Sequence, residues 1–339
     1  ATFIAIKNNQ IQQLRKVVNI ALAEPKIDQG FVSAFGWAPP AMAKHIVHLL
    51  LNSKFVKWRR LGIITAVANH IDCENFLEKL INDVDIDLNA LALKAIGKLG
   101  YQNLMPILLR NLRLAHRDHR FWAAWSAVLL GNRQAALETL TGFALAPLPL
   151  LQKHALQLIL RVADPQDFAR WTTIVAKHNH SLQSIMGGAG ACQNTLWVPW
   201  LIESMGIPEH ANLAGEAFTL LTGTDLIDAG LMRPRVIHPS ESQMINSIEM
   251  AQLLLPDVKA VQAWWSNNQN RYQQTTRYLL GREITIENCL GILKTGRQYQ
   301  RIIAALELGL LKDKFPLLET QASSFQQRSW MDGLEEQAR

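Results

Sequence analysis

Alternating aspartates near residue 85 are the first residues whose type and spacing could bind a ligand. Asp83, Asp85 and Asp87 follow the spacing of a calcium-binding loop, in which carboxylate oxygens surround the ion. The position that such a loop gives to glycine holds Leu88, and the position that it gives to glutamate holds Lys94. We therefore expect these carboxylates to cap the next helix, because the free amides at a helix N-terminus need acceptors.

Two histidine pairs and one glycine-rich segment could also support chemistry. His45 and His48, like His116 and His119, are three residues apart, a spacing that can place two imidazoles on one helix face. Neither pair has cysteine or carboxylate partners at the spacing of a metal site. The segment 186–193 lacks the Gly-Lys-Ser/Thr sequence of a phosphate-binding loop. We therefore expect no catalytic residue, no metal ion and no cofactor.

Helices must position these residues, and the predicted helices recur at a fixed period. Apolar residues at three-and-four spacing predict a helix that begins near Asp87 and ends at Gly100, followed by a second helix after a short turn. Equivalent helix ends recur every 29 to 32 residues, at His70, Gly100, Gly131, Ala163, Cys192 and Gly223. A period in this range is typical of helical solenoids, in which each hairpin buries its apolar face against the next.

A column of small residues supports the same register. Eight positions before each helix end stand Gly62, Ala92, Ala123, Ala155, Ser184 and Gly215. A small residue at one fixed position lets two helices approach closely. The sequence therefore predicts an all-α fold, an α-solenoid of helical hairpins of about 30 residues each.

Breaks in the period divide the chain into parts. We expect an N-terminal helix and loop cap at 1–40, with Phe35 and Trp37 at the tip of the loop, and then a repeat array at 41–225. An irregular insert is expected at 226–252, because this segment contains prolines and shows no regular apolar face.

Helical repeats are expected to resume after the insert. They should occupy 253–320, with one helix over 273–281. The segment 321–339 is polar, and we expect it to fray.

Several motifs in the second half of the chain are built on tryptophan, proline and glycine. They are Trp197-Val198-Pro199-Trp200, Pro256-Asp257, Ala263-Trp264-Trp265, Arg277-Tyr278-Leu279-Leu280-Gly281 and Gly296-Arg297-Gln298. With these motifs, the region 182–318 resembles an uncharacterised bacterial HEAT-like family whose members tend to be encoded among type VI secretion and effector-loading genes. Residues 88–112 and 197–223 resemble short bacterial HEAT repeats more generally. The resemblance implies HEAT-like hairpins and a scaffold or partner-binding role, and it supplies no catalytic residues.

Positive charge is concentrated in the first half of the chain. Residues 1–169 contain 19 Lys and Arg against 12 Asp and Glu, whereas the remainder contains 15 against 16. A basic patch is expected at repeat edges, interleaved with Trp58, Phe121 and Trp122; it comprises Lys57, Arg59, Arg110, Arg113, Arg117 and Arg120. Such a patch can hold nucleic acid or an acidic protein, or it can be the solvated rim of an amphipathic array.

The leading functional hypothesis is a non-enzymatic scaffold or adaptor, or a toxin-neutralising protein. Stacked hairpins create a long concave surface, which suits a protein partner such as a secretion component, an effector or a toxin. Positions six and ten before each helix end should point outward together, which predicts a partner-binding stripe of Arg60, Lys94, Phe121, Trp125, Lys153 and Gln157. In the alternative arrangement, Phe121 and Trp125 turn inward and belong to the core.

The alternative function is nucleic-acid binding, including a HEAT-like DNA glycosylase that would use Asp118 beside Trp122. Composition limits both hypotheses to a protein without a membrane partner, because no apolar run approaches the length of about 18 residues that a membrane span needs. The N-terminal residues do not have the layout of a signal peptide. The three cysteines, Cys73, Cys192 and Cys289, are too few and too widely spaced for a disulfide framework, which favours the cytoplasm.

Overall fold

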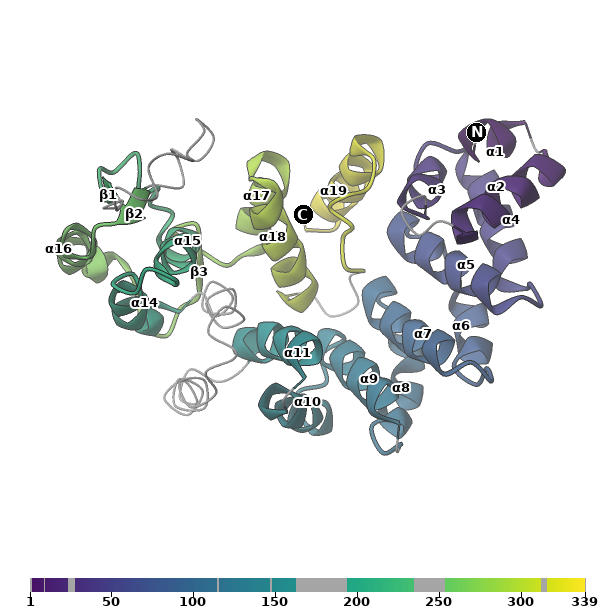
Figure 1. Cartoon of the computed structure of the whole chain (residues 1–339), viewed down its shortest axis with the longest axis horizontal. Coiled ribbons are helices and arrows are strands. Elements are labelled where there is room, and N and C mark those ends of the chain that lie inside the picture. The colour runs from purple at the N-terminus through teal and green to yellow at the C-terminus, as the bar shows by residue number, and fades with distance from the viewer. Residues whose placement is uncertain are drawn as a thin grey trace, which may run out of the picture. The chain divides into compact units, whose positions relative to one another are not determined.

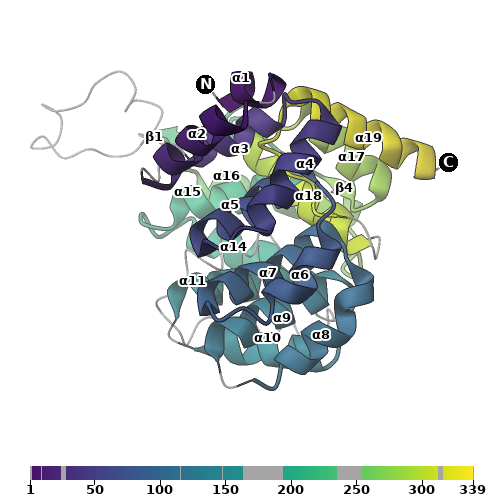
Figure 2. The same ribbon diagram turned by 90° about the vertical axis from the view of Figure 1, so that its right-hand side faces the viewer.

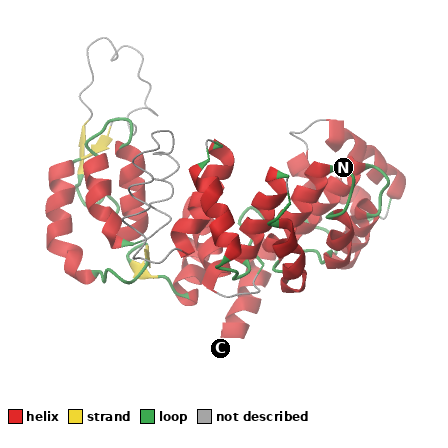
Figure 3. Cartoon of the chain, turned by 90° about the horizontal axis from the view of Figure 1, so that it is seen from below, coloured by secondary structure: helices red, strands yellow, loops and turns green. Residues whose placement is uncertain are grey.

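The computed structural model describes most of the chain and is mostly helical (Figure 1). The described residues are 2–8, 10–23, 28–114, 116–146, 148–162, 194–234, 254–311 and 316–338. Within them, the only sheets are two antiparallel pairs of short strands (Figure 3), so the prediction of a helical protein is confirmed. None of the described helices is both long and apolar enough to cross a membrane.

The chain forms two compact units, residues 1–140 with 289–339 and residues 141–288. The helices of the first unit, and α10 and α17 at its boundaries, are α1 (Thr2–Lys7), α2 (Ile11–Ala23), α3 (Asp28–Phe35), α4 (Pro40–Leu51), α5 (Val56–Asn69), α6 (Glu74–Leu80), α7 (Ile86–Leu99), η1 (Gln102–Leu104), α8 (Met105–Asn111), α9 (Arg117–Leu129), α10 (Ala135–Leu145), α17 (Ile286–Thr295), α18 (Gln298–Leu311) and α19 (Ser324–Ala338).

The second unit combines helices with the two strand pairs. Its elements are α11 (Pro149–Val162), η3 (Thr195–Trp197), α14 (Val198–Ser204), α15 (Ala211–Thr222), β1 (Met232–Pro234), β2 (Leu254–Pro256), α16 (Val258–Asn268), η6 (Gln269–Arg271), β3 (Tyr278–Leu279) and β4 (Arg282–Glu283). In the first pair Arg233 lies opposite Leu255, and in the second Tyr278 lies opposite Glu283.

The helix ends predicted from the period are confirmed wherever the structure describes them. His70, Gly100 and Gly223 end α5, α7 and α15 in the left-handed conformation, with φ of 50°, 77° and 73°. Gly131, just beyond α9, has φ of 96°. Glycine adopts this conformation without steric strain, whereas the Cβ of His70 makes the same backbone conformation unfavourable. Two further predicted ends, Ala163 and Cys192, lie outside the described residues.

The predicted small column is closely surrounded wherever the structure describes it. Ala92, Ala123 and Ala155 are fully buried, and a Cβ added to Gly62 would lie 2.9 Å from Leu51 Cδ2. The fifth described member, Gly215, is likewise tightly enclosed, since an added Cβ would lie 3.0 Å from the nearest side-chain atoms. Ser184 lies outside the described residues.

Two predicted segments have a different structure. The expected loop around Phe35 is the helix α3, in which Phe31 and Phe35 are buried one turn apart with ring centroids 5.1 Å apart; Trp37 alone of the predicted tip is exposed. The expected helix over 273–281 is the start of the β3–β4 hairpin. In the expected insert, β1 pairs with β2, and residues 235–252 lie outside the described residues.

The turn of the β3–β4 hairpin closes the C-terminal end of α15. The backbone amide of Leu280 donates to the Leu220 carbonyl oxygen at 2.6 Å, and that of Gly281 donates to the Leu221 carbonyl oxygen at 3.0 Å. These carbonyls belong to the last turn of the helix, which has no intrahelical donors for them. A Cβ on Gly223 would lie 2.5 Å from Leu280 O, so the two backbones meet only because glycine stands there.

The polar C-terminal segment does not fray, because it packs on helices of the N-terminal half (Figure 2). Trp330 of α19 stacks on His70, with ring centroids 4.0 Å apart. Gln326 Nε2 donates to Asn69 Oδ1 at 3.2 Å, and the Leu317 amide donates to the Lys98 carbonyl oxygen at 2.7 Å. The segment 316–334 is therefore part of the folded first unit.

Candidate functional site

A groove of about 1050 Å³ opens between α2 and the α4–α5 hairpin. We call it the α2/α4 groove. Its α2 wall consists of Leu14, Arg15, Val18, Asn19 and Ala23. These positions recur at helical spacing, so one face of α2 lines the groove along most of its length.

The opposite wall is the end of α4, the loop 52–55 and the first turn of α5. Ile46 and Leu50 form buried floor on this side, whereas Leu49 is 46% exposed and Phe55 is 56% exposed. Large apolar side chains left open to water inside a concave surface are typical of binding sites. Phe55 contacts Trp58 with ring centroids 6.2 Å apart, which places two aromatic rings side by side at this wall.

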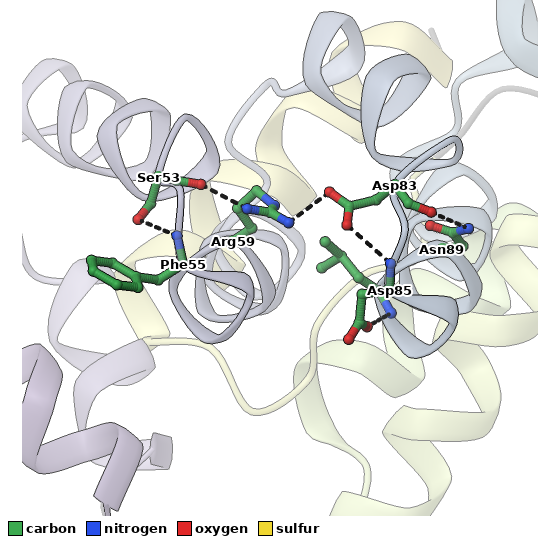
Figure 4. Close-up of polar contacts among 7 residues, drawn as sticks. Ser53, Phe55, Arg59, Asp83, Asp85 and Asn89 are labelled. Atoms are coloured by element: carbon green, nitrogen blue, oxygen red, sulfur yellow. Dashed lines mark hydrogen bonds and ion pairs between the residues drawn. The ribbon is translucent and has the colours of Figure 1, made fainter.

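Arg59 holds the loop that forms the rim of the groove (Figure 4). Its Nη1 donates to the Ser53 carbonyl oxygen at 2.9 Å, and its Nη2 pairs with Asp83 Oδ2 at 2.7 Å. The Phe55 amide donates to Ser53 Oγ at 3.2 Å. The Arg59 and Asp83 side chains are only 13% and 15% exposed, so water screens this pair weakly. Arg59 is therefore a support for the rim.

Asp83 is held in turn by the start of α7 (Figure 4). Its Oδ1 accepts the Asp85 amide at 3.1 Å, and its carbonyl oxygen accepts Asn89 Nδ2 at 3.0 Å. Asp85 Oδ1 accepts the Leu88 amide at 2.8 Å and caps α7, while Asp87 lies in the first turn. The prediction of helix capping is confirmed for Asp85.

The remaining members of the predicted basic patch occupy two places in the first unit. Lys57 lines the α2/α4 groove. Arg110 and Arg113 are exposed at the end of α8, and Arg120 lies in the first turns of α9. Arg117 Nε donates to Asp118 Oδ1 at 3.0 Å, so the acid named for a glycosylase already has a cationic partner.

The predicted partner-binding stripe is wrong at its aromatic members. Phe121 and Trp125 are 0% and 7% exposed, so the inward alternative holds for both. Helix α9 packs against both α7 and α8, which leaves no open face there for these rings. Ala90 lies ten positions before the helix end at Gly100, so the same pattern predicts that it points outward; it is also buried.

The polar members of the stripe are divided between the two units. Lys94 Nζ lies 4.0 Å from the centre of the Trp122 ring, and burial, with a smaller effect of Lys98, lowers the pKa of Lys94 to about 8. Arg60 is exposed in the first unit; Lys153 is exposed and Gln157 half-buried in the second. Arg60 therefore remains the only stripe residue close in sequence to the α2/α4 groove.

One histidine of each pair and the two described cysteines take structural positions. His48 Nε2 lies 3.0 Å from the Asp72 carbonyl oxygen, and His119 Nε2 lies 3.0 Å from that of Ile86. Burial raises the pKa of the Cys73 thiol to about 12, which makes it a poor nucleophile near neutral pH. Over the described ranges, no three His, Cys, Asp or Glu side chains come together as a metal site would require. The glycine-rich segment 186–193 lies outside these ranges.

Four of the five motifs that suggested a family lie in the second unit and serve packing there, whereas Gly296-Arg297-Gln298 lies in the first unit. Trp197 is fully buried, and Trp264 meets Phe218 edge to face with ring centroids 5.6 Å apart. Asp257 caps α16 by accepting the Lys259 and Ala260 amides. The motif that ends in Gly281 closes α15, as described above. These residues therefore contribute to the packing and helix capping of the unit.

No family model, no curated protein and no solved structure matches the chain. The α2/α4 groove is therefore the feature of the molecule that bears on function.

Proposed function

We propose that the protein is a non-enzymatic binding scaffold or adaptor whose HEAT-like hairpins form an α-solenoid. Its partner would be another protein, for which a type VI secretion component, an effector or a toxin is the class that the sequence resemblance favours. The α2/α4 groove carries this proposal, because it is concave, apolar at its floor and open to water at Leu49 and Phe55. The free thiol of Cys73 suits a reducing cytoplasm.

Two further observations support binding rather than catalysis. The ion pair of Arg59 and Asp83 holds the rim in place before any partner arrives, which reduces the entropy lost on binding. The titratable groups singled out for chemistry are instead used within the fold: Asp85 caps a helix and Asp118 pairs with Arg117.

Site-specific photo-cross-linking tests the proposal in cells of the source organism. A photoreactive residue would replace Leu49 in the groove, and Leu150, which is 72% exposed in the second unit, would carry the same residue as the matched control. We expect a discrete protein, identified by mass spectrometry, to be captured from position 49 and not from position 150. Equal capture from both positions, or none from position 49, would contradict a partner in the groove.

Nucleic-acid binding is the second candidate function, and the exposed Arg110, Arg113 and Arg117 favour it. Binding of duplex DNA through phosphate contacts would weaken steeply as salt rises. Replacing all three arginines by glutamine should then abolish binding and its salt dependence. If the wild-type chain shows no salt-dependent binding to duplex DNA, this candidate is excluded.

A further inference from the structure

Among the residues that the structure describes, the rim of the α2/α4 groove carries positive charge and no negative charge. Arg15, Lys54 and Lys57 are exposed there, and none of the residues that line the groove is acidic. The surrounding chain has the same bias, since residues 1–60 contain nine Lys and Arg against two Asp and Glu. Charges of one sign around a concave site raise the local potential and favour an anionic partner.

The floor of the groove is apolar and recessed. Val18, Leu50 and Ile46 are 1%, 2% and 3% exposed, and they lie below the exposed wall formed by Leu49 and Phe55. A lipid bilayer is entered by apolar side chains that project, whereas these are withdrawn. A nucleic-acid backbone needs polar partners along the site, which this floor does not offer.

The size of the groove is sufficient for a segment of polypeptide. Its volume of about 1050 Å³ lies just above the range of about 300–1,000 Å³ that is typical of pockets for small ligands. Its walls lie on α2 and the end of α4, so it is a channel between helices. An amphipathic helix fits such a channel by placing one apolar stripe on the floor.

We propose that the α2/α4 groove binds an acidic amphipathic helix of a partner protein, an inference that rests on the proposed scaffold function. The apolar stripe of that helix contacts the exposed Leu49 and Phe55 above the floor of Val18, Ile46 and Leu50, with Trp58 as a second aromatic contact at this wall. Carboxylates that flank the stripe pair with Arg15, Lys54 and Lys57. Arg59 takes no direct part, because its guanidinium group is already used by Asp83 and Ser53.

Synthetic peptides provide a direct probe for the full-length chain. One peptide is a helix of about five turns with leucine at positions i, i+3, i+4 and i+7 and glutamate elsewhere. A second has the same composition in scrambled order, and a third carries lysine in place of glutamate. By fluorescence anisotropy, we expect only the first to bind. Equal binding of the scrambled peptide, or tighter binding of the lysine peptide, would overturn the proposal.

Charge reversal at the rim locates the binding. The double variant Lys54→Glu, Lys57→Glu should weaken binding of the acidic peptide at least about tenfold, as expected for interfacial charge pairs. Its matched control is Lys79→Glu, Arg328→Glu, which changes the net charge equally at exposed positions of the same unit. We expect the control to bind within about twofold of the wild type. Equal weakening in both double variants would show a general charge effect and overturn the proposal.

Two further assays test whether a membrane or a nucleic acid binds the groove instead. One is sedimentation with vesicles of phosphatidylcholine and phosphatidylserine, and the other is binding of duplex DNA. If the peptides do not bind, and Lys54→Glu, Lys57→Glu abolishes binding of the vesicles or the DNA, the rim serves that other partner and the proposal is wrong. Cross-linking from Leu49 without binding of the acidic peptide overturns only the chemistry of the partner. Failure of both experiments overturns the scaffold function as well.

Discussion

Separating Arg59 from Asp83 tests whether the rim of the α2/α4 groove is held by a buried ion pair. Arg59→Ala removes two charge-assisted hydrogen bonds, to Asp83 and to the Ser53 carbonyl oxygen. Bonds of this kind contribute about 1.5–3 kcal/mol each. The substitution also removes Arg59 Nε, which is buried without a hydrogen-bond partner among the described residues. Removing this unsatisfied donor offsets part of the free energy lost with the two bonds. We expect Arg59→Ala to cost about 3 kcal/mol of the free energy of unfolding.

Asp83→Ala should have a similar cost, because it leaves a largely buried guanidinium group without its anion. The double variant should cost less than the sum of the single ones. The coupling energy is expected to be about 2 kcal/mol, measured by urea denaturation of the four proteins at pH 7.

An exposed ion pair in the same unit supplies the control. Lys44 Nζ lies 3.8 Å from Asp72 Oδ2, and the two side chains are 51% and 64% exposed. Solvent screens such a pair, so its coupling energy should not exceed about 0.5 kcal/mol. A coupling energy for Arg59 and Asp83 as small as that of the control would refute the reasoning.

Three further predictions follow from packing and titration. Gly97→Ala should destabilise the protein by about 1–3 kcal/mol, because the new Cβ would lie 2.7 Å from the Ser126 Cα. Gly142→Ala, whose Cβ would have no atom within 4 Å, should stabilise the protein by about 0.5–1 kcal/mol in thermal melts. Equal effects would contradict the close crossing of α7 and α9. Burial lowers the pKa of His70 from 6.5 to about 4. Between these pH values the unfolded state therefore binds more protons than the folded state. The free energy of unfolding should fall by up to about 3 kcal/mol as pH drops from 6.5 to 4. His70→Asn, which tolerates the left-handed backbone, should flatten this pH profile; an unchanged profile would refute the assignment. Deleting 321–339 should lower the thermal unfolding midpoint by several degrees, because it removes the stacked Trp330 and the buried Met331 and Leu334. An unchanged midpoint would indicate that this segment is frayed.

Local chemistry explains which parts of the fold could be predicted from the sequence. A helix that ends in a left-handed residue favours glycine, and a close helix crossing excludes large side chains, so Gly100, Gly223 and Ala92 were informative by themselves. The helix α3 could have been predicted as well. Phe31 and Phe35 are four residues apart and mark its buried face, but the neighbouring glycines and prolines suggested a loop.

Long-range packing explains what could not be predicted. The contact between Gln326 and Asn69 joins residues 257 positions apart, and no local pattern indicates it. The predicted partner-binding stripe requires one face of α9 to be open to solvent. In the structure α7 and α8 pack against α9, and Phe121 is buried. For the α2/α4 groove, the predicted basic patch includes only one wall, at Lys57 and the neighbouring Trp58, because the opposing wall comes from α2.

Hydrogen–deuterium exchange of the full-length chain, with and without the acidic amphipathic peptide, tests most directly whether the α2/α4 groove is a binding site. We predict that bound peptide slows exchange in fragments that cover 11–23 and 46–60, with the largest change in the loop 52–55. Exchange over α8 and α9 should not change. Slower exchange confined to α8 and α9, or unchanged exchange throughout at saturating peptide, would contradict binding in the groove.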